Sequence, residues 1–348
     1  MLLTGCAKDP LVQRESFVFG TRVEILIWGA STDKANEAAS AVLQEFDRLH
    51  REFHAWQPSQ LTALNDDIAA GKPHKVSPEL AQLIIDAQNE SKRGDYLFDP
   101  GIGAEVKLWG FHDDTFKPQL PDAEALEALK SAHPSISDLV MDGLCPGLGK
   151  SSDVAAGCQV LSLNRAVALD FGGYLKGVAL DHAAAILRAN GVKNALVNIG
   201  GNIIALGKKG DQPWRVGIQH PRNTGPLASL ELRDGEAIGT SGDYQRYFEF
   251  NGRRYCHLID PRLAMPADGT QSLTILIPAG QVKPGMRSDA DSKPLFVAGK
   301  EWPAMAKKTG LAHILRVDNL GKVEITPEMK SRITFETADL HATLRPAQ

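Results

Sequence analysis

Residues 170–177 hold the arrangement best suited to chemistry. They read Asp-Phe-Gly-Gly-Tyr-Leu-Lys-Gly, so an apolar segment ends in Asp170, two glycines follow, and a helix is expected to begin near Lys176. Paired glycines let the backbone approach a ligand closely, and the N–H groups at the beginning of a helix favour an anion. The octet therefore predicts a site for a phosphate or diphosphate, with Lys176 adding a positive charge. It matches neither the Walker A nor the G-x-G-x-x-G pattern, and a tight turn whose glycines serve packing explains it equally well.

Three other groups of residues are candidates for chemistry. His257 lies on a strand that leaves a predicted hairpin, where an imidazole is either a catalytic base or a structural group. Asp289 and Asp291 stand between two serines, which suits either a hard cation such as Mg²⁺ or a solvated helix cap. Trp56 and the Phe-Asp-Pro sequence at 98–100 provide aromatic surface for a flavin or adenine ring, although core packing explains each of them as well.

The composition is that of a globular protein. The chain has 348 residues, of which 43% are hydrophobic and 23% charged, and 38 basic against 42 acidic side chains give a net charge of −4. These values argue against a disordered or fibrous chain. No basic tract is present, which argues against nucleic acid as a partner, since neutralising phosphates needs clustered Lys and Arg. No uncharged apolar run reaches the roughly 18 residues of a membrane-spanning helix.

The four cysteines, at positions 6, 145, 158 and 256, include no C-x-x-C pair, which argues against a zinc site. Residues 1–6 (Met-Leu-Leu-Thr-Gly-Cys) read like the end of a bacterial lipoprotein signal, although its positive segment and most of its apolar segment are missing. An accidental match is the alternative. We interpret residues 1–16 as a signal remnant and linker, with a lipid on Cys6 as the only link to a membrane. Cys158 and Cys256 are then expected to be buried and unreactive, with a disulfide as the rarer outcome.

Strands and helices are predicted to mix without strict alternation, which favours an α+β fold. Residues 17–27 form a predicted strand that contains Gly20 and Thr21. Asn251-Gly252 is a strong hairpin signal between predicted strands at 247–250 and 253–259. The other predicted strands are residues 166–170, 195–199, 214–219 and 272–277.

Helices are predicted where capping residues precede apolar residues at helical spacing. The first begins at Ser31 or Thr32 and ends near residue 50, and the second begins at the cap Ser77. Residues 56–65 are interpreted as a polar connection between them, and residues 118–149 as a short helix with loops. The other predicted helices are residues 176–190, ended by Gly191, and residues 302–310.

In this order along the chain, the segments resemble the ApbE family of FAD:protein FMN transferases. The likeness runs from about residue 19 to residue 296, and the ordered set is far more specific than any single segment. The matching segments are Gly20-Thr21, 59–65, Phe98-Asp99-Pro100, Leu108-Trp109-Gly110-Phe111, 170–181, 198–202, 214–218, Ser241-Gly242 and 257–262.

The resemblance implies an ApbE-like α+β fold in two subdomains with an FAD cleft between them, built by residues 17–348 as one domain. It implies FAD as substrate, Mg²⁺, and a periplasmic lipoprotein anchored to a bacterial membrane. It also implies exported flavin-accepting domains of membrane redox complexes as partners. By position, the residues expected to contact FAD are Phe19, Trp56, Leu97, Phe98, Asp99, Asp170, Lys176 and His257. The residues expected at the metal are Gly173, Asp289, Ser292 and Lys293.

The sequence departs from the family pattern at the metal site. After the metal-binding Asp the family reads Ala-Leu-Ala-Thr, whereas Asp289 is followed by Ala-Asp-Ser-Lys, so Lys293 stands where the family has Thr. An ammonium beside a divalent ion is electrostatically unfavourable. Either Asp291 compensates or Lys293 takes over part of the metal's charge. A second departure follows Arg262, where Leu-Ala replaces the family's Thr-Gly.

The predicted reaction is transfer of FMN from FAD to a Thr or Ser hydroxyl of an exported acceptor protein, with release of AMP. His257 is expected to take the hydroxyl proton with a near-neutral pKa, while Lys176 and a Mg²⁺ ion bound by Asp289 offset phosphate charge. One alternative is an FAD pyrophosphatase, in which water replaces the acceptor hydroxyl. A second alternative is a non-catalytic FAD-binding module, suggested by Lys293.

Overall fold

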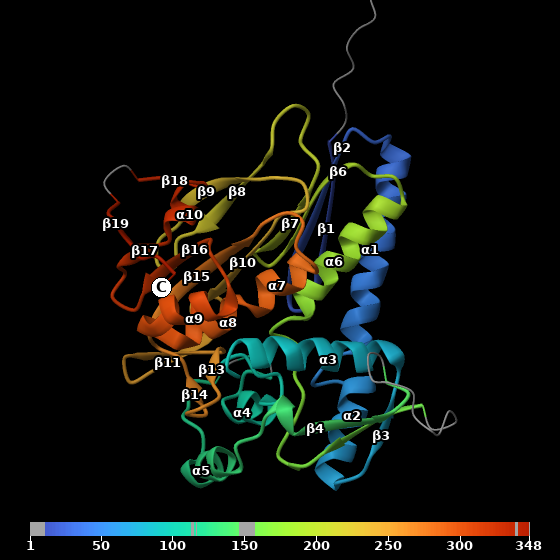
Figure 1. The fold of residues 1–348 in the computed structure, drawn as a ribbon, viewed down its shortest axis with the longest axis vertical. Coiled ribbons are helices and arrows are strands. Elements are labelled where there is room, and N and C mark those ends of the chain that lie inside the picture. The colour runs from blue at the N-terminus through green and yellow to red at the C-terminus, as the bar shows by residue number, and fades with distance from the viewer. Residues whose placement is uncertain (1–10, 113–114, 116, 146–156, 338–339, 348) are drawn as a thin grey trace, which may run out of the picture.

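A nine-stranded sheet forms the centre of the molecule (Figure 1). The computed structural model describes residues 11–112, 115, 117–145, 157–337 and 340–347, and Cys6 lies outside these ranges. Neighbouring strands are antiparallel except for the last pair, which is parallel. In spatial order the strands are β1 (Leu11–Val18), β2 (Thr21–Trp28), β6 (Asn194–Ile199), β7 (Asn202–Leu206), β10 (Ala237–Gly242), β15 (Thr270–Ile277), β16 (Ile314–Asp318), β17 (Val323–Ile325) and β19 (Ala342–Leu344).

Helices cover one face of this sheet, and a three-stranded sheet covers the other. Because side chains alternate along a strand, Ala195 and Val197 of β6 pack with the helices, whereas Leu196 packs with the smaller sheet. The helices are α1 (Thr32–Glu52), α6 (Leu175–Ala189), α7 (Pro284–Ala290), α8 (Ser292–Ala298) and α9 (Trp302–Thr309). The smaller sheet has the order β18 (Ile333–Phe335), β9 (Pro226–Leu232) and β8 (Trp214–Gln219).

A second part of the chain lies below the main sheet in Figure 1 and is mostly helical. Its buried residues Leu83 and Val160 belong to the same apolar core as Val23 of the main sheet. It comprises α2 (Gln60–Ala70), β3 (His74–Val76), α3 (Pro78–Arg93), α4 (Gly103–Leu108), α5 (Ala123–Ala132), β4 (Leu139–Gly143) and β5 (Cys158–Ser162). Two hairpins adjoin it, β11 (Tyr247–Phe250) with β12 (Arg253–Cys256) and β13 (Ile259–Asp260) with β14 (Met265–Pro266), while α10 (Pro327–Lys330) lies near the C-terminus. The mixed α+β architecture predicted from the sequence is confirmed.

Three predicted strands are wrong in their extent. The strand predicted at residues 253–259 ends at Cys256 in β12, so His257 lies beyond it. Residues 17–27 do not form one strand, because Phe19 and Gly20 have φ of 57° and 67° and reverse the chain between β1 and β2. This is the backbone of a two-residue hairpin turn, with positive φ at both central positions. Residues 166–170 make only one β-bridge, from Ala168 to Ile102, and the N–H of Asp170 donates to the carbonyl of Pro100.

The connection predicted at residues 56–65 contains the beginning of a helix. Ser59 caps α2: its hydroxyl accepts from the N–H groups of Leu61 and Thr62, and the Thr62 hydroxyl accepts from the Ser59 N–H. This reciprocal cap satisfies backbone N–H donors at the beginning of α2. The polar composition of residues 56–65 did not indicate that a helix begins there. The predicted helices at 32–50, 176–190 and 302–310 are confirmed within two residues at each end, as is the beginning at Pro78.

Cys158 is buried, as predicted, but it has the rarer of the two expected outcomes, because it forms a disulfide with Cys145 across a sequence separation of 13. Cys256 is free and buried, as predicted, and burial raises the pKa of its thiol to about 12. Disulfides persist in oxidising compartments and are rare in reducing ones.

Reduction of this disulfide is expected to lower the free energy of unfolding by about 3 kcal/mol, since a loop of this length confines the unfolded chain. Denaturant unfolding with and without reductant measures the difference. The matched control is the Cys145→Ser/Cys158→Ser variant, in which added reductant should change nothing. Equal stability of the oxidised and reduced protein would contradict the expectation.

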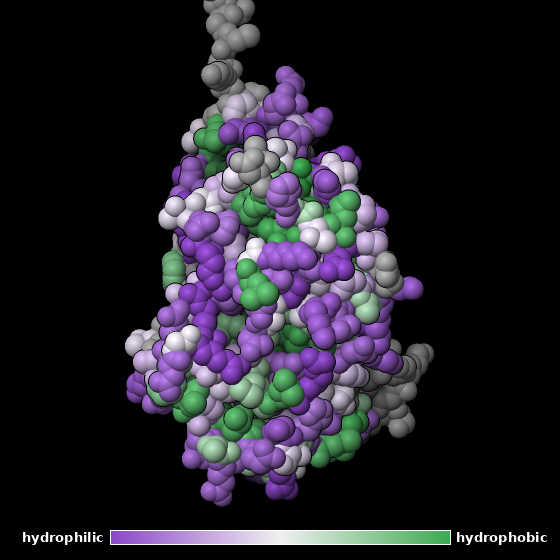
Figure 2. All heavy atoms as spheres, turned by 90° about the vertical axis from the view of Figure 1, so that its left-hand side faces the viewer, coloured by the Kyte–Doolittle hydropathy of each residue, from purple (hydrophilic) through white to green (hydrophobic). Residues whose placement is uncertain are grey.

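The face shown in Figure 2 is largely hydrophilic, with hydrophobic residues scattered over it. Within the described part of the chain, no helix is both long and apolar enough to cross a bilayer.

Candidate active site

A cavity of about 960 Å³ lies between the two parts of the molecule. The β1–β2 hairpin and the β10 end contribute one side, while the segments around Trp56 and Phe98 contribute the other. Ligand pockets have volumes of roughly 300–1,000 Å³, so this one is large enough for an extended ligand. It brings together eleven of the twelve residues singled out from the sequence: Phe19, Trp56, Leu97, Phe98, Asp99, Asp170, Gly173, Lys176, His257, Asp289 and Lys293. Ser292 is not among the lining residues.

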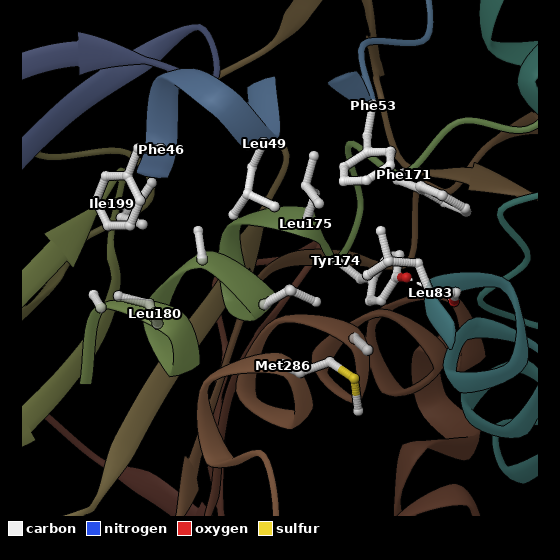
Figure 3. Close-up of a cluster of buried hydrophobic side chains, with 14 of the residues drawn as sticks. Phe46, Leu49, Phe53, Leu83, Phe171, Tyr174, Leu175, Leu180, Ile199 and Met286 are labelled. Atoms are coloured by element: carbon white, nitrogen blue, oxygen red, sulfur yellow. Dashed lines mark hydrogen bonds between the residues drawn. The ribbon is translucent and has the colours of Figure 1, made fainter. Parts of the chain in front are cut away.

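The Gly172–Gly173 turn forms part of the cavity wall and is fixed from behind by two aromatic side chains. Phe171 and Tyr174 are fully buried, and the Tyr174 hydroxyl donates to the Leu83 carbonyl at 2.7 Å (Figure 3). On the cavity side, the Gly172 N–H donates to Asp170 at 2.8 Å. Burial raises the pKa of the Asp170 carboxyl. The turn is thus a rigid feature at the beginning of α6.

Both explanations of the paired glycines apply. A Cβ on Gly173 would stand 3.1 Å from the Phe98 ring and 3.2 Å from Cε of Lys293, so the missing side chain lets both groups pack against the turn. The same turn lies in the cavity, and Lys176 donates from Nζ to the Gly172 carbonyl at 2.9 Å. Packing and ligand approach are therefore served by one feature.

Aromatic rings form part of the cavity lining. Phe19 contacts His50 edge-on, with ring centroids 5.5 Å apart, and Trp56 contacts His112 at 5.8 Å. Phe98 contacts Tyr174 of the glycine turn at 6.2 Å. The histidines were missed from the sequence, because neither belongs to a motif and only α1 geometry brings His50 beside Phe19.

Asp99 lines the cavity, but its carboxylate holds the protein together. It accepts from the N–H groups of Gly101 and Ile136, both at 2.8 Å, and from the Ser135 hydroxyl at 2.6 Å. Burial raises the pKa of Asp99 in spite of these bonds. With both oxygens engaged, Asp99 fixes the position of Phe98 and Pro100, so it acts as a positioning residue.

His257 lies in the cavity wall beside Arg246. Its Nδ1 lies 3.2 Å from the Arg246 carbonyl, which can only accept, so Nδ1 carries the proton and Nε2 is left as the basic nitrogen. Burial, then the charges of Arg246 and Lys176, lower the pKa of His257 to about 3. The near-neutral pKa expected from the sequence is therefore wrong for the free protein, because the imidazole is buried and also shares its site with three cationic side chains.

Arg246 was missed from the sequence, although the hairpin contained the signal. The Asn251-Gly252 turn pairs Tyr247 with Cys256, and the next residues outward, Arg246 and His257, are joined by a backbone hydrogen bond of 3.1 Å. Extending the predicted register by one residue would have placed Arg246 against His257.

His257 should make the protein less stable in acid. Its pKa is about 3 in the folded state against 6.5 for an ordinary histidine. Between these two pH values the imidazole is protonated in the unfolded chain but not in the folded protein. Unfolding is thus favoured below pH 6.5, increasingly so down to about pH 3, and by about 2 kcal/mol at pH 5. Glutamine at position 257 does not titrate, so His257→Gln lacks this loss of stability in acid. Between pH 7.5 and pH 5, the free energy of unfolding of wild type should therefore fall by about 2 kcal/mol more than that of the variant. Parallel stability curves over this range would contradict the assignment.

Asp289 lies between two lysines. Its Oδ1 lies 2.6 Å from Nζ of Lys293, and its Oδ2 accepts from the Gly177 N–H at 3.0 Å and lies 3.9 Å from Nζ of Lys176. Burial alone would raise the pKa of Asp289, but Lys176 and Lys293 outweigh it, and the pKa is lowered. Burial lowers the pKa of Lys293 against the opposing effect of Asp289. The carboxylate is therefore already neutralised by side chains of the chain itself.

Lys293 is offset neither by Asp291, the possible compensating charge, nor by Ser292 of the expected metal site. Asp291 forms ion pairs with Arg93 and Arg287 instead of Lys293. Ser292 is buried, and its hydroxyl makes hydrogen bonds with the Asp289 carbonyl at 2.8 Å and the Ser241 hydroxyl at 2.7 Å.

These residues do not fit a divalent cation. An ion bonded to Asp289 Oδ1 would stand within roughly 4 Å of the Lys293 ammonium, where two unit charges repel by about 4 kcal/mol and a divalent ion by about 8 kcal/mol. The Lys293 ammonium also donates to the main-chain carbonyl of Asp289 at 2.8 Å, so it is held at this position by two acceptors.

Sequence and structure comparisons identify the family of this chain. The profile of the ApbE family matches residues 19–315. The chain belongs to the ApbE family. It is 40% identical to an FAD:protein FMN transferase of Rhodobacter capsulatus over 95% of this chain and 60% of that protein. It is 32% identical to an FAD:protein FMN transferase of Treponema pallidum over 85% of this chain and 81% of that protein.

The crystal structure of the ApbE protein from Thermotoga maritima superimposes with a TM-score of 0.80 at 30% identity, covering 93% of this chain and 99% of that one. The ApbE-like fold is therefore confirmed. The named relatives are enzymes, so the comparisons place this chain among flavin transferases.

Proposed function

We propose that this ApbE-family chain transfers FMN from FAD to a hydroxyl of an acceptor protein and releases AMP. The observation that carries the proposal is the composition of the cavity, whose lining combines aromatic rings with the cationic side chains Lys176, Lys293 and Arg246 and the neutral imidazole of His257. Aromatic faces suit planar rings, and clustered cations suit a diphosphate. FAD carries both in one extended molecule.

The residues of the chain would divide the binding between them. Phe19, Trp56 and Phe98 offer ring faces, and the diphosphate would approach the Gly172–Gly173 turn at the beginning of α6, next to Lys176. Catalysis would then consist mainly of positioning and charge stabilisation, as in other phosphoryl transfers. The family resemblance implies Mg²⁺ at Asp289, but the Lys293 ammonium already pairs with that carboxylate. The proposed mechanism therefore does not use Mg²⁺.

His257 would accept the proton of the attacking hydroxyl. The hydroxyl oxygen forms a bond to the phosphorus of the FMN half, the bond from that phosphorus to the bridging oxygen breaks, and AMP leaves with the electron pair. The neutral Nε2 is in the state required of a base, and the anionic diphosphate would raise the pKa of His257 from its low value by opposing the charges of Lys176 and Arg246.

The acceptors we propose are exported flavin-bearing domains of membrane redox complexes. Their site of modification would be a Thr or Ser on an exposed loop that enters the cavity. The disulfide between Cys145 and Cys158 supports a compartment outside the cytoplasm, and the lipoprotein-like sequence before Cys6 favours a lipid anchor in a bacterial periplasm.

An assay of the purified chain with FAD, with and without an acceptor domain, tests the function. We expect AMP release in proportion to the flavin bound covalently to the acceptor, and little AMP without acceptor. Steady AMP release without acceptor would instead identify an FAD pyrophosphatase. FAD binding without AMP or flavinylated protein would identify a non-catalytic flavin-binding protein.

A further inference from the structure

Lys293 has the position of a ligand-facing cation. It lines the cavity, yet only 11% of its side chain is exposed, and its ammonium lies 2.6 Å from Asp289 Oδ1 and 2.8 Å from the Asp289 carbonyl. An ammonium has three N–H donors, so one remains for a ligand in the cavity. The position is set by chain geometry, because Asp289 and Lys293 are four residues apart across the junction of α7 and α8.

The surroundings hold Lys293 in this position. Its aliphatic part packs against Gly173, where a Cβ would stand 3.2 Å from Cε. Asp291, the nearest other acid in the sequence, forms ion pairs with Arg93 and Arg287, and within the described residues Lys293 forms an ion pair with Asp289 alone.

Around the Gly172–Gly173 turn, the positive side chains outnumber the negative ones. Asp289 and Asp170 contribute one negative charge each, while Lys176, Lys293 and Arg246 contribute one positive charge each, which leaves one net positive charge around the Gly172–Gly173 turn. Asp289 also accepts from the Gly177 N–H. A lysine that served only to neutralise Asp289 would duplicate Lys176, so the surplus charge is available to an anionic ligand.

We propose that the Lys293 ammonium takes the place of a divalent cation as the counter-charge for the substrate's diphosphate, so that this chain binds and cleaves FAD without a divalent metal at Asp289. The inference rests on the proposed function for the identity of the substrate. One part of the inference, that Lys293 excludes a divalent ion from Asp289, depends only on the geometry of these residues. It is tested separately from the pairing of Lys293 with the diphosphate.

The first experiment measures Mn²⁺ binding to the full chain by electron paramagnetic resonance, with and without FAD. Wild type should show no Mn²⁺ site that depends on Asp289, whereas Lys293→Thr should gain one. Lys293→Thr/Asp289→Asn should lose the gained site, which separates it from adventitious binding at other acidic side chains. Mn²⁺ binding to wild type that Asp289→Asn abolishes would overturn the proposal, as would the absence of a gained site in a folded Lys293→Thr variant.

The second experiment measures FAD affinity by flavin fluorescence, in EDTA and in Mg²⁺. Wild-type affinity should be the same in both, and Lys293→Met should lose about tenfold to a hundredfold in either, as expected for one charge-assisted hydrogen bond. Lys293→Arg should recover part of this loss, and Lys307→Met, which does not line the cavity, should bind as wild type does. A tenfold gain of wild-type affinity on adding Mg²⁺, or an unchanged affinity of Lys293→Met, would overturn the proposal.

The two proposals fail in different ways. If wild type binds FAD equally in EDTA and Mg²⁺ but transfers nothing to an acceptor, the flavin transfer is wrong and the role of Lys293 stands. If wild type transfers FMN only when Mg²⁺ is present, the role of Lys293 is wrong and the flavin transfer stands.

Discussion

Replacing His257 by alanine is expected to slow FMN transfer by roughly 10²–10⁴-fold, the usual contribution of a general base. FAD affinity should change little, because the neutral imidazole adds no charge to the cation cluster that faces the diphosphate. Single-turnover transfer to an acceptor, with FAD held above its Kd, measures the chemical step. Titration of FAD into the same variant measures binding.

His257→Gln and His313→Ala serve as controls. Glutamine keeps a donor for the Arg246 carbonyl but cannot accept a proton, so it should be as slow as alanine while retaining the structure of the hairpin. His313 does not line the cavity, and its replacement should leave transfer unchanged. If His257→Ala lost FAD binding along with transfer, His257 would be a ligand contact and the base would have to be sought elsewhere.

Replacing Gly177 by valine is expected to damage both the fold and the site. A Cβ at this position would stand 2.4 Å from the Gly285 carbonyl and 2.7 Å from Cβ of Asp289, so α6 and α7 could not pack as they do. Helix propensity alone would favour any residue over glycine by less than about 1 kcal/mol, whereas overpacking costs about 1–3 kcal/mol and occasionally more. The cost of overpacking should therefore exceed the gain in helix propensity, and the variant should be less stable than wild type. The displaced Asp289 would also lose its hydrogen bond from the Gly177 N–H.

Denaturant unfolding and FAD titration check this expectation together. Gly217→Val is the matched control, because a Cβ on Gly217 would meet only Pro226, at an ordinary contact distance of 3.4 Å. That variant should lose little stability and keep its affinity for FAD. A Gly177→Val protein as stable as wild type would show that the two helices can separate without cost.

The three longest helices of the described chain could be predicted from the sequence, because their signals are local. Ser77 with Pro78 begins α3, and apolar spacing defines α1 and α6. The β1–β2 turn was missed, because a positive φ at Phe19 is imposed by strand pairing, which a run of Val, Ile and Phe does not reveal.

The candidate site was predicted mainly through resemblance to a family. Local patterns left the glycine turn and His257 open to structural explanations, and only their ordered combination favoured a flavin site. What the sequence could not provide was the environment of each group. The pKa of His257 depends first on its burial and also on Lys176, which approaches from α6, and the hydrogen bonds that engage Asp99 come from residues 101, 135 and 136.

A crystal structure of the full chain grown with FAD in the presence of EDTA tests the central claim most directly. The account predicts that the diphosphate lies against the backbone of Gly172 and Gly173 within hydrogen-bond distance of Lys176 and Lys293, with the ring systems among Phe19, Trp56 and Phe98. Flavin bound outside the cavity, or a diphosphate directed away from this turn, would contradict it.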